Sequence, residues 1–384
     1  MSASPLAAPR PDARAEEDRR FMRLALALGD RHLGLTWPNP SVGAVVVADR
    51  GGEPAIVGQG VTQPGGRPHA ERVALEQAGD AARGATLYVT LEPCSSRSKR
   101  DFGASCTDLI LESGIRRLVI GAPDPSPFAH GTGFARLKAA GVEVTGDVLA
   151  EDAARAHRGH VLRVTEGRPS VMLKFARTAD GYAARRSGPR LLISGEVSNG
   201  RTHLLRAHHD AIMVGIGTIL ADDPLLNVRL PGLENRSPLR VVIDSGLRLP
   251  PASRLVATAG EIPTWVVAAE ASPVEAERAL VAAGVEVMRV EASGHRVDLR
   301  AALKLLATRG LTRVFSEGGP AIGEALIEAD LVDTFALATS RTALGEPGIP
   351  ALGARLERAL VESFHHVGSE DLGADQLDIF ERAR

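Results

Sequence analysis

The chain has 384 residues, a length that suggests two domains, and 44% of its residues are hydrophobic while only 3% are aromatic. Each domain can therefore bury a core, which must be built mainly from Leu, Val, Ile and Ala. The 45 basic and 47 acidic residues leave a net charge of −2. This balance disfavours a nucleic-acid partner, because nucleic-acid binders usually carry a basic excess.

Two further features bear on location. Residues 1–20 lack the apolar stretch of a signal peptide, and no run approaches the length of a membrane span, so we expect no membrane partner. The two cysteines, Cys94 and Cys106, fit a reducing compartment, where a close pair is more often catalytic or metal-binding than bridged. A cytoplasmic enzyme is therefore expected.

The first half of the chain alternates between predicted helices and strands. Residues 1–20 are expected to form a flexible tail, and apolar spacing from Phe21 predicts the first helix. A break at 37–40 follows. Predicted strands then cover 42–47, 55–58, 86–91, 117–121 and 142–144, and predicted helices cover 69–79, 106–113, 133–140 and 151–164. The alternation predicts a layered α/β domain over residues 21–166.

The turn-forming sequence Gly167-Arg168-Pro169 marks the predicted domain boundary, and residues 167–384 repeat the alternation. Predicted strands cover 170–175, 211–215, 239–244, 264–268, 285–290, 313–316 and 334–338, and predicted helices cover 197–207, 299–308 and 321–328. A second α/β domain follows from this pattern.

One group of residues in the first domain indicates a metal site. Pro68-His69-Ala70-Glu71 opens a predicted helix, Cys94 follows a predicted strand, and Cys106 begins the next helix. One imidazole and two thiolates suit tetrahedral zinc with a position left for water, and Glu71 can shuttle a proton without being a ligand. His-x-Glu followed by Pro-Cys is typical of zinc deaminases of aminopyrimidine-like rings.

The spacing leaves other interpretations open. Eleven residues separate Cys94 from Cys106, whereas cytidine-type deaminases usually place two between their cysteines. A His-x-Glu sequence also occurs by chance, and two cysteines can simply be buried. A structural zinc site would need four ligands, and the sequence offers only three obvious ones.

The second domain carries weaker signals. Glu317-Gly318-Gly319-Pro320 lies between a predicted strand and a predicted helix, where glycines let backbone N–H groups approach an anion, although such a turn is more often a tight connection. Arg206 and Arg229 can be solvated arginines or a phosphate clamp. The clustered histidines 203, 208 and 209, like 157 and 160, are interpreted as solvated helix faces.

Ordered motifs in both domains give the chain a resemblance to the bifunctional deaminase–reductases of riboflavin biosynthesis, from about Phe21 to the C-terminus. The matching segments are Pro38-Asn39-Pro40, Pro68-His69-Ala70-Glu71, Thr90-Leu91-Glu92-Pro93-Cys94, Asp124-Pro125, Leu173-Lys174, Asp180-Gly181, Leu205-Arg206-Ala207, Ala221-Asp222-Asp223-Pro224, Val242-Ile243-Asp244-Ser245 and Glu317-Gly318-Gly319-Pro320.

The resemblance implies a cytidine-deaminase-like domain followed by a dihydrofolate-reductase-like domain, with Zn²⁺ and NADPH as cofactors. The first domain would hydrolyse a ring amine of a diaminopyrimidine ribosylamino phosphate, and the second would reduce the ribosyl group to a ribityl chain. Reductases of this kind often pair, so a homodimer is expected.

Site residues follow from the same resemblance, position by position. The zinc ligands would be His69, Cys94 and Cys106, with Glu71 as the catalytic proton shuttle. Substrate-binding positions would be Asn39, Arg206, Arg229 and Glu317, and cofactor-binding positions would be Thr218, Asp222, Ser245 and Gly319. Lys174 and Asp180 are the candidate proton donors of the reductase.

One loop departs from the family pattern. Residues 95–105 form a longer segment than the family's His-containing loop and carry Arg97, Lys99 and Arg100 instead. Two alternatives therefore stand beside the riboflavin assignment: a related deaminase acting on another aminopyrimidine, or a non-catalytic module stabilised by zinc. A basic side chain of this loop could also supply a phosphate contact.

Overall fold

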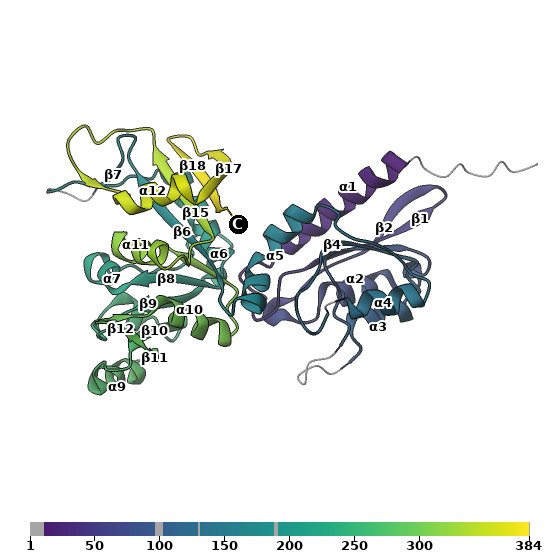
Figure 1. The fold of residues 1–384 in the computed structure, drawn as a ribbon, viewed down its shortest axis with the longest axis horizontal. Coiled ribbons are helices and arrows are strands. Elements are labelled where there is room, and N and C mark those ends of the chain that lie inside the picture. The colour runs from purple at the N-terminus through teal and green to yellow at the C-terminus, as the bar shows by residue number, and fades with distance from the viewer. Residues whose placement is uncertain (1–10, 97–102, 130, 188–190, 384) are drawn as a thin grey trace, which may run out of the picture. The chain divides into compact units, whose positions relative to one another are not determined.

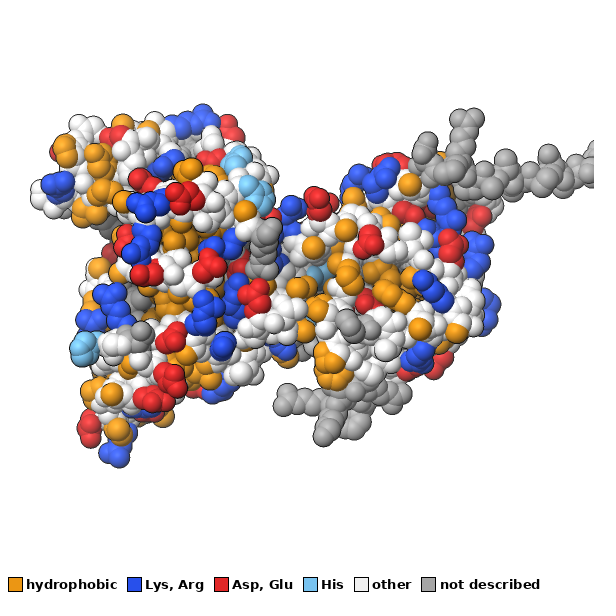
Figure 2. All heavy atoms as spheres, viewed as in Figure 1, with side chains coloured by type: hydrophobic (Ala, Val, Ile, Leu, Met, Phe, Trp, Pro, Cys, Tyr) orange, Lys and Arg blue, Asp and Glu red, His pale blue; other side chains and the backbone are white. Residues whose placement is uncertain are grey.

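The computed structural model describes residues 11–96, 103–129, 131–187 and 191–383. The chain divides into two compact units, Met1–Glu166 and Gly167–Arg384, which are labelled by element in Figure 1. None of the helices in the described ranges has the length and apolar character needed to cross a lipid bilayer. On the face seen in Figure 2, acidic and basic side chains are intermixed, in keeping with the small net charge.

The first unit is a five-stranded sheet with strand order β2-β1-β3-β4-β5. The β1–β2 and β1–β3 pairs are antiparallel, and the β3–β4 and β4–β5 pairs are parallel. The elements are α1 (Pro11–Asp30), β1 (Gly43–Arg50), β2 (Glu53–Val61), η1 (Pro64–Gly66), α2 (Ala70–Ala78), η2 (Gly79–Ala82), β3 (Thr86–Leu91), α3 (Cys106–Glu112), β4 (Arg117–Ala122), α4 (Thr132–Ala139), β5 (Glu143–Thr145) and α5 (Ala150–Thr165).

Alternating side chains of β1 build a core on each face of this sheet. Val45 and Val47 pack with α1, while Ala44 and Val46 belong to the cluster that includes α2, α3 and α4. Helix α1 approaches β1 closely at Gly43, where an added Cβ would lie 1.8 Å from the carbonyl oxygen of Ala25. The sheet therefore fixes α2 and α3, the two helices that carry His69, Glu71 and Cys106.

The prediction of a tail through residue 20 is wrong for residues 11–20, because α1 begins at Pro11. Residues 1–10 lie outside the described ranges. Asp18 accounts for the longer helix: its carboxylate is buried and accepts hydrogen bonds from Arg117 at 2.6 and 2.7 Å and from the Tyr88 hydroxyl at 3.0 Å. This tertiary contact holds the polar start of the helix against the sheet.

The second unit is a nine-stranded sheet with strand order β11-β10-β9-β8-β14-β6-β15-β18-β17. The first seven strands of this order, from β11 through β10, β9, β8, β14 and β6 to β15, are parallel to one another. Strand β18 pairs antiparallel with β15, and β17 pairs antiparallel with β18. The strands are β6 (Ser170–Arg177), β7 (Tyr182–Ala184), β8 (Ala211–Gly215), β9 (Leu239–Ile243), β10 (Thr264–Ala269), β11 (Glu286–Val290), β12 (Ala292–Ser293), β13 (Arg296–Val297), β14 (Arg313–Ser316), β15 (Thr334–Ser340), β16 (Ile349–Pro350), β17 (Phe364–Asp371) and β18 (Asp375–Arg382).

The helices of this unit connect the parallel strands. They are α6 (Glu196–Ala207), α7 (Ile216–Asp222), η3 (Glu234–Arg236), α8 (Arg254–Ala257), α9 (Val274–Ala282), α10 (Leu299–Thr308), α11 (Pro320–Glu328) and α12 (Ala354–Glu362). Because the carboxyl ends of parallel strands share one edge of a sheet, the segments after β8, β9 and β14 are brought together there. These segments contain most of the residues singled out in the second half of the sequence.

Candidate active sites in the two units

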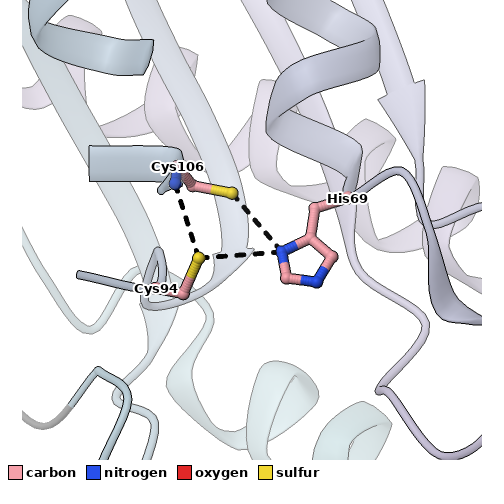
Figure 3. A group of neighbouring side chains, drawn as sticks. All are labelled: His69, Cys94 and Cys106. Carbon is pink, nitrogen blue, oxygen red and sulfur yellow. Dashed lines mark hydrogen bonds between the residues drawn. The ribbon is translucent and has the colours of Figure 1, made fainter. Parts of the chain in front are cut away.

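The structure brings His69, Cys94 and Cys106 together. His69 is the N-cap of α2, Cys94 follows β3, and Cys106 is the first residue of α3. Their ligand atoms lie within 4.8 Å of one another, and Figure 3 shows Nδ1 of His69 facing both sulfur atoms. Nδ1 is 3.4 Å from Sγ of Cys106 and 3.8 Å from Sγ of Cys94.

These separations fit a zinc ion. Tetrahedral zinc with Zn–N bonds of about 2.0 Å and Zn–S bonds of about 2.3 Å holds its nitrogen and sulfur ligands about 3.6 Å apart. Both cysteines are free thiols in the structure. Three protein ligands leave the fourth position of a tetrahedral site for water or substrate, which is the arrangement of catalytic rather than structural zinc.

The environment of Cys94 favours its thiolate form, whereas the hydrogen bond with Cys94, followed by burial, raises the pKa of Cys106. The hydrogen bond from the Cys106 thiol, with further contributions from His69, lowers the pKa of Cys94 to about 4. The backbone N–H of Cys106 also donates to Sγ of Cys94 at 3.4 Å. Because a thiolate is the metal-binding form of cysteine, the environment of Cys94 favours metal coordination before any ion arrives.

Glu71 is the second residue of α2, two positions after His69, and belongs to the same site. Its side chain is 3% exposed, and burial raises the pKa of its carboxyl, with His69 acting in the opposite direction. The carboxyl also interacts with the Cys106 side chain. A carboxyl with a raised pKa beside the metal ligands is suited to accept a proton and return it.

A cavity of about 140 Å³ opens onto these residues and is lined in part by Asn39, His69, Glu71, Cys94 and Asp124. The amide nitrogen of Asn39 donates to the carbonyl oxygen of Gly66 at 2.9 Å. Gly66 has φ +84°, and a Cβ there would lie 2.7 Å from that amide nitrogen. Because only glycine fits this close to Asn39, the turn can hold the Asn39 amide group in place in the lining of the cavity.

Asp124 and His160 form a pair in this cavity that the sequence analysis missed. Oδ1 of Asp124 accepts hydrogen bonds from the Ser126 N–H and from Nε2 of His160, each at 2.8 Å. The expectation of a solvated face for the two histidines of α5 is wrong, because His160 is about 90% buried and His157 is buried against Thr90. The Asp124-Pro125 motif was the one available signal.

The basic loop residues Arg97, Lys99 and Arg100 fall outside the described residues, so their contribution to the cavity stays a prediction. The described residues resume at Gly103, and Ser105 is the N-cap of α3.

In the second unit, Arg206 and Glu317 form a two-point ion pair. Nε and Nη2 of Arg206, on α6, donate to the two carboxylate oxygens of Glu317 at 2.6 and 2.9 Å. The interpretation of Arg206 as a solvated arginine is therefore wrong. Lys174, on β6, interacts electrostatically with both residues, and burial lowers the pKa of its ammonium group while Glu317 opposes that shift.

The predicted cofactor positions are only partly brought together. Thr218, on α7, lies beside the N-cap of α11, since a Cβ on Gly319 would be 3.8 Å from its hydroxyl. Asp222 lines two cavities of this unit, and one of them also contains Arg206 and Arg229. Ser245 lines neither, and its hydroxyl accepts the N–H of Val297 at 2.9 Å.

Asp180 does not fit the role of a proton donor. Its carboxylate accepts hydrogen bonds from Thr178 and from the backbone N–H groups of Leu344 and Gly345. The Thr178 hydrogen bond is the main reason that the pKa of Asp180 falls to about 2. Asp180 is thus an ionised carboxylate that fixes a loop, which leaves Lys174 as the candidate.

Comparisons with protein-family models match both units. Residues 15–122 match the cytidine and deoxycytidylate deaminase zinc-binding region, and residues 169–372 match the RibD C-terminal domain. These matches confirm the prediction of a cytidine-deaminase-like domain followed by a dihydrofolate-reductase-like domain.

Full-length relatives and solved structures agree. The riboflavin biosynthesis protein RibD of Aquifex aeolicus is 36% identical over 371 residues, which cover 96% of this chain and 99% of the relative. The Escherichia coli protein of the same name is 34% identical, covering 92% and 98%.

The Acinetobacter baumannii RibD structure superposes with a TM-score of 0.82 at 29% identity, covering 96% of this chain and all of that chain. The Thermotoga maritima diaminohydroxyphosphoribosylaminopyrimidine deaminase/5-amino-6-(5-phosphoribosylamino)uracil reductase superposes with a TM-score of 0.80 at 31% identity, with the same coverage. The chain therefore belongs to the RibD family, the bifunctional deaminase–reductases of riboflavin biosynthesis.

Proposed function

We propose that this chain hydrolyses the 2-amino group of 2,5-diamino-6-(5-phosphoribosylamino)pyrimidin-4-one and then uses NADPH to reduce the ribosyl group to a ribityl chain. The observation that carries the first step is the meeting of His69, Cys94 and Cys106 beside the buried carboxyl of Glu71. The full-length similarity to RibD proteins supports the pairing of the two steps.

In the deaminase unit, His69, Cys94 and Cys106 would hold zinc. Bound zinc lowers the pKa of water toward neutrality and so makes a nucleophile available. Glu71 takes up the proton released from water and delivers it to the departing amine, acting as general base and then as general acid. Asn39 and Asp124 lie in the same cavity and would orient the ring through its polar edges.

In the reductase unit, NADPH would supply the hydride, which passes to C1 of the opened ribosylamino group. Lys174 would supply the proton, because its lowered pKa makes the ammonium group a better donor than an ordinary lysine. Glu317 holds Arg206 by two hydrogen bonds and also interacts with Lys174. Thr218 and Gly319 would contact the cofactor at the edge where β8 and β14 end.

Product analysis tests this assignment. The full-length protein is loaded with zinc and given the diaminopyrimidine phosphate, with and without NADPH, and the products are identified by mass. Without NADPH we expect replacement of one amino group by an oxo group, and with NADPH a further gain of one hydride and one proton. An unchanged substrate in both reactions would contradict the proposal.

The same assay separates the alternatives. A related deaminase would leave the riboflavin intermediate unchanged and convert another aminopyrimidine offered in parallel. A non-catalytic module would bind zinc tightly, convert none of the compounds and leave NADPH unbound. A site with three protein ligands and a buried Glu71 beside the cavity favours catalysis, because structural zinc is usually bound by four protein ligands.

A further inference from the structure

A cavity of about 450 Å³ in the second unit gathers three arginines from separate segments. Arg206 belongs to α6, Arg229 follows α7, and Arg254 is the first residue of α8. The sequence analysis selected Arg206 and Arg229 but gave no role to Arg254. Its place in the cavity could not be inferred from spacing, since 24 intervening residues separate it from Arg229.

The positive charges in this cavity are incompletely balanced. Arg206 is paired with Glu317, whereas Nη1 of Arg229 donates, among the described residues, only to the neutral amide oxygen of Asn227, at 2.8 Å. In the part of the chain that the structure describes, the guanidinium of Arg254 takes part in no hydrogen bond or ion pair. Three arginines therefore line the cavity with a single described carboxylate, that of Asp222, and Glu317 pairs with Arg206.

The mutual repulsion of the three arginines also indicates a site for an anion. Burial, followed by the charges of Arg206 and Arg254, lowers the pKa of Arg229. Like charges held together at a cost are relieved by an anion, and guanidinium groups suit phosphate because their N–H donors match its oxygens two at a time.

The backbone places Arg254 at the cavity. Its N–H donates to Oδ1 of Asp223 at 2.9 Å, which ties the start of α8 to the end of α7. Asp223 has φ +40° and Leu226 has φ +53°, two left-handed non-glycine residues in one short turn. Such conformations persist only where the surroundings enforce them, here the Asp223 contact and the buried side chain of Leu226.

We propose that Arg254 is the third arm of a phosphate-binding site completed by Arg206 and Arg229, and that Asp223 is its positioning residue. The inference rests on the proposed reductase function. The phosphate of the substrate is the favoured ligand, because Arg206 joins this cavity to Glu317 and Lys174, where reduction is proposed. The 2′-phosphate of NADPH has the same chemistry and is distinguished by the experiment.

The reductase step of the full-length enzyme is measured with the deaminated substrate and with its dephosphorylated counterpart. Arg254→Ala is expected to raise KM for the phosphorylated substrate about tenfold to a hundredfold, the loss of a charged hydrogen bond. We expect kcat, and KM for the dephosphorylated compound, to stay unchanged. Arg254→Lys should recover part of the loss, and Arg278→Ala, an exposed arginine of α9, serves as the control.

A second set of measurements compares KM for NADPH with KM for NADH in the same variants. A rise in KM for NADPH alone would support the phosphate site and assign the phosphate to the cofactor. Equal effects of Arg254→Ala on phosphorylated and dephosphorylated reactants, or no effect on any of them, would overturn the proposal.

Asp223→Ala should raise the same KM as Arg254→Ala without lowering kcat. Asp223→Asn should restore it, because its amide oxygen can still accept the Arg254 N–H. A fall in kcat with both Asp223 variants would overturn the positioning role.

Binding of inorganic phosphate to the full-length protein, measured by calorimetry, needs no turnover. Wild type is expected to bind it more tightly than Arg254→Ala, while equal binding would contradict the site. If the wild type binds phosphate but converts neither reductase substrate, the proposed reductase function fails while the anion site stands.

Discussion

At the scale of single residues, two opposing effects act on the pKa of Glu71. Burial of its carboxyl raises the pKa, whereas the neighbouring His69 favours the charged form and lowers it. Glu71→Gln keeps the shape and removes the exchangeable proton. We expect zinc content to be retained while deaminase kcat falls by about 10²- to 10⁴-fold, the usual contribution of a positioned acid–base group.

Glu76→Gln is the matched control for that variant, because Glu76 is on the same helix with a side chain that is 63% exposed. It should deaminate at the rate of wild type. If Glu71→Gln also does so while holding zinc, Glu71 carries no proton in this reaction.

His209 gives a second residue-level prediction, on acid stability. The expectation of a solvated face is wrong for His209, because its side chain is buried and stacks on Phe315, and burial lowers its pKa to about 3. The unfolded chain therefore takes up a proton at a pH where the folded chain does not, and the stability from neutral His209 is lost as pH falls below about 6.5. At pH 5 the loss is about 2 kcal/mol.

Hydrogen exchange in β8 and β14, the strands near His209, measures this loss. His209→Gln is expected to be less stable at neutral pH but to show a flatter dependence of protection on pH. A variant whose protection falls with acid as steeply as that of wild type would show that another group titrates.

The sequence could predict the metal ligands but not the pair that lines the same cavity. Short sequence motifs contain His69, Glu71 and Cys94, and each motif indicates its chemistry without knowledge of the fold. Asp124 and His160 are 36 positions apart, and a histidine on a polar helix resembles a surface residue until the sheet beneath it is known. Long-range contacts of this kind leave no periodic signal in one sequence.

At the scale of elements, α3 depends on its first turn. Ser105 accepts the Asp108 N–H while Asp108 accepts the Ser105 N–H, a capping box that fixes the helix end carrying Cys106. Ser105→Ala should cost about 1 kcal/mol of stability and weaken zinc binding. Chelator competition measures the affinity, and Ser113→Ala, at the other end of α3, should leave it near that of wild type. Equal affinities for wild type and Ser105→Ala would mean that the metal, and not the cap, holds the helix end.

The predicted elements fared best where a strand is buried on both faces. Strands β3, β8 and β14 have the predicted bounds, because runs of mostly apolar residues mark strands that are covered on both faces. The hairpin of β17 and β18 was missed. Most residues of β17 are exposed, so its sequence carries polar side chains on both faces and resembles a loop.

At the scale of the whole molecule, each unit has its own sheet and its own hydrophobic clusters. The second unit begins at Gly167, which has φ +68°, a conformation that favours glycine. The candidate zinc ligands all belong to the first unit, and Lys174, Arg206 and Glu317 all belong to the second. Metal and hydride chemistry are thus assigned to separate cores.

This separation predicts that metal removal divides the two activities. After dialysis against a chelator, the deaminase activity should be lost, while reduction of the already deaminated substrate with NADPH should continue at the rate of the untreated enzyme. The first unit should also lose stability, because the binding energy of a metal that only the folded state holds adds to folding. Added Zn²⁺ should restore the deaminase activity. If both activities fall together and only zinc restores both, the reductase core depends on the metal, and the assignment of the two chemistries to independent units is wrong.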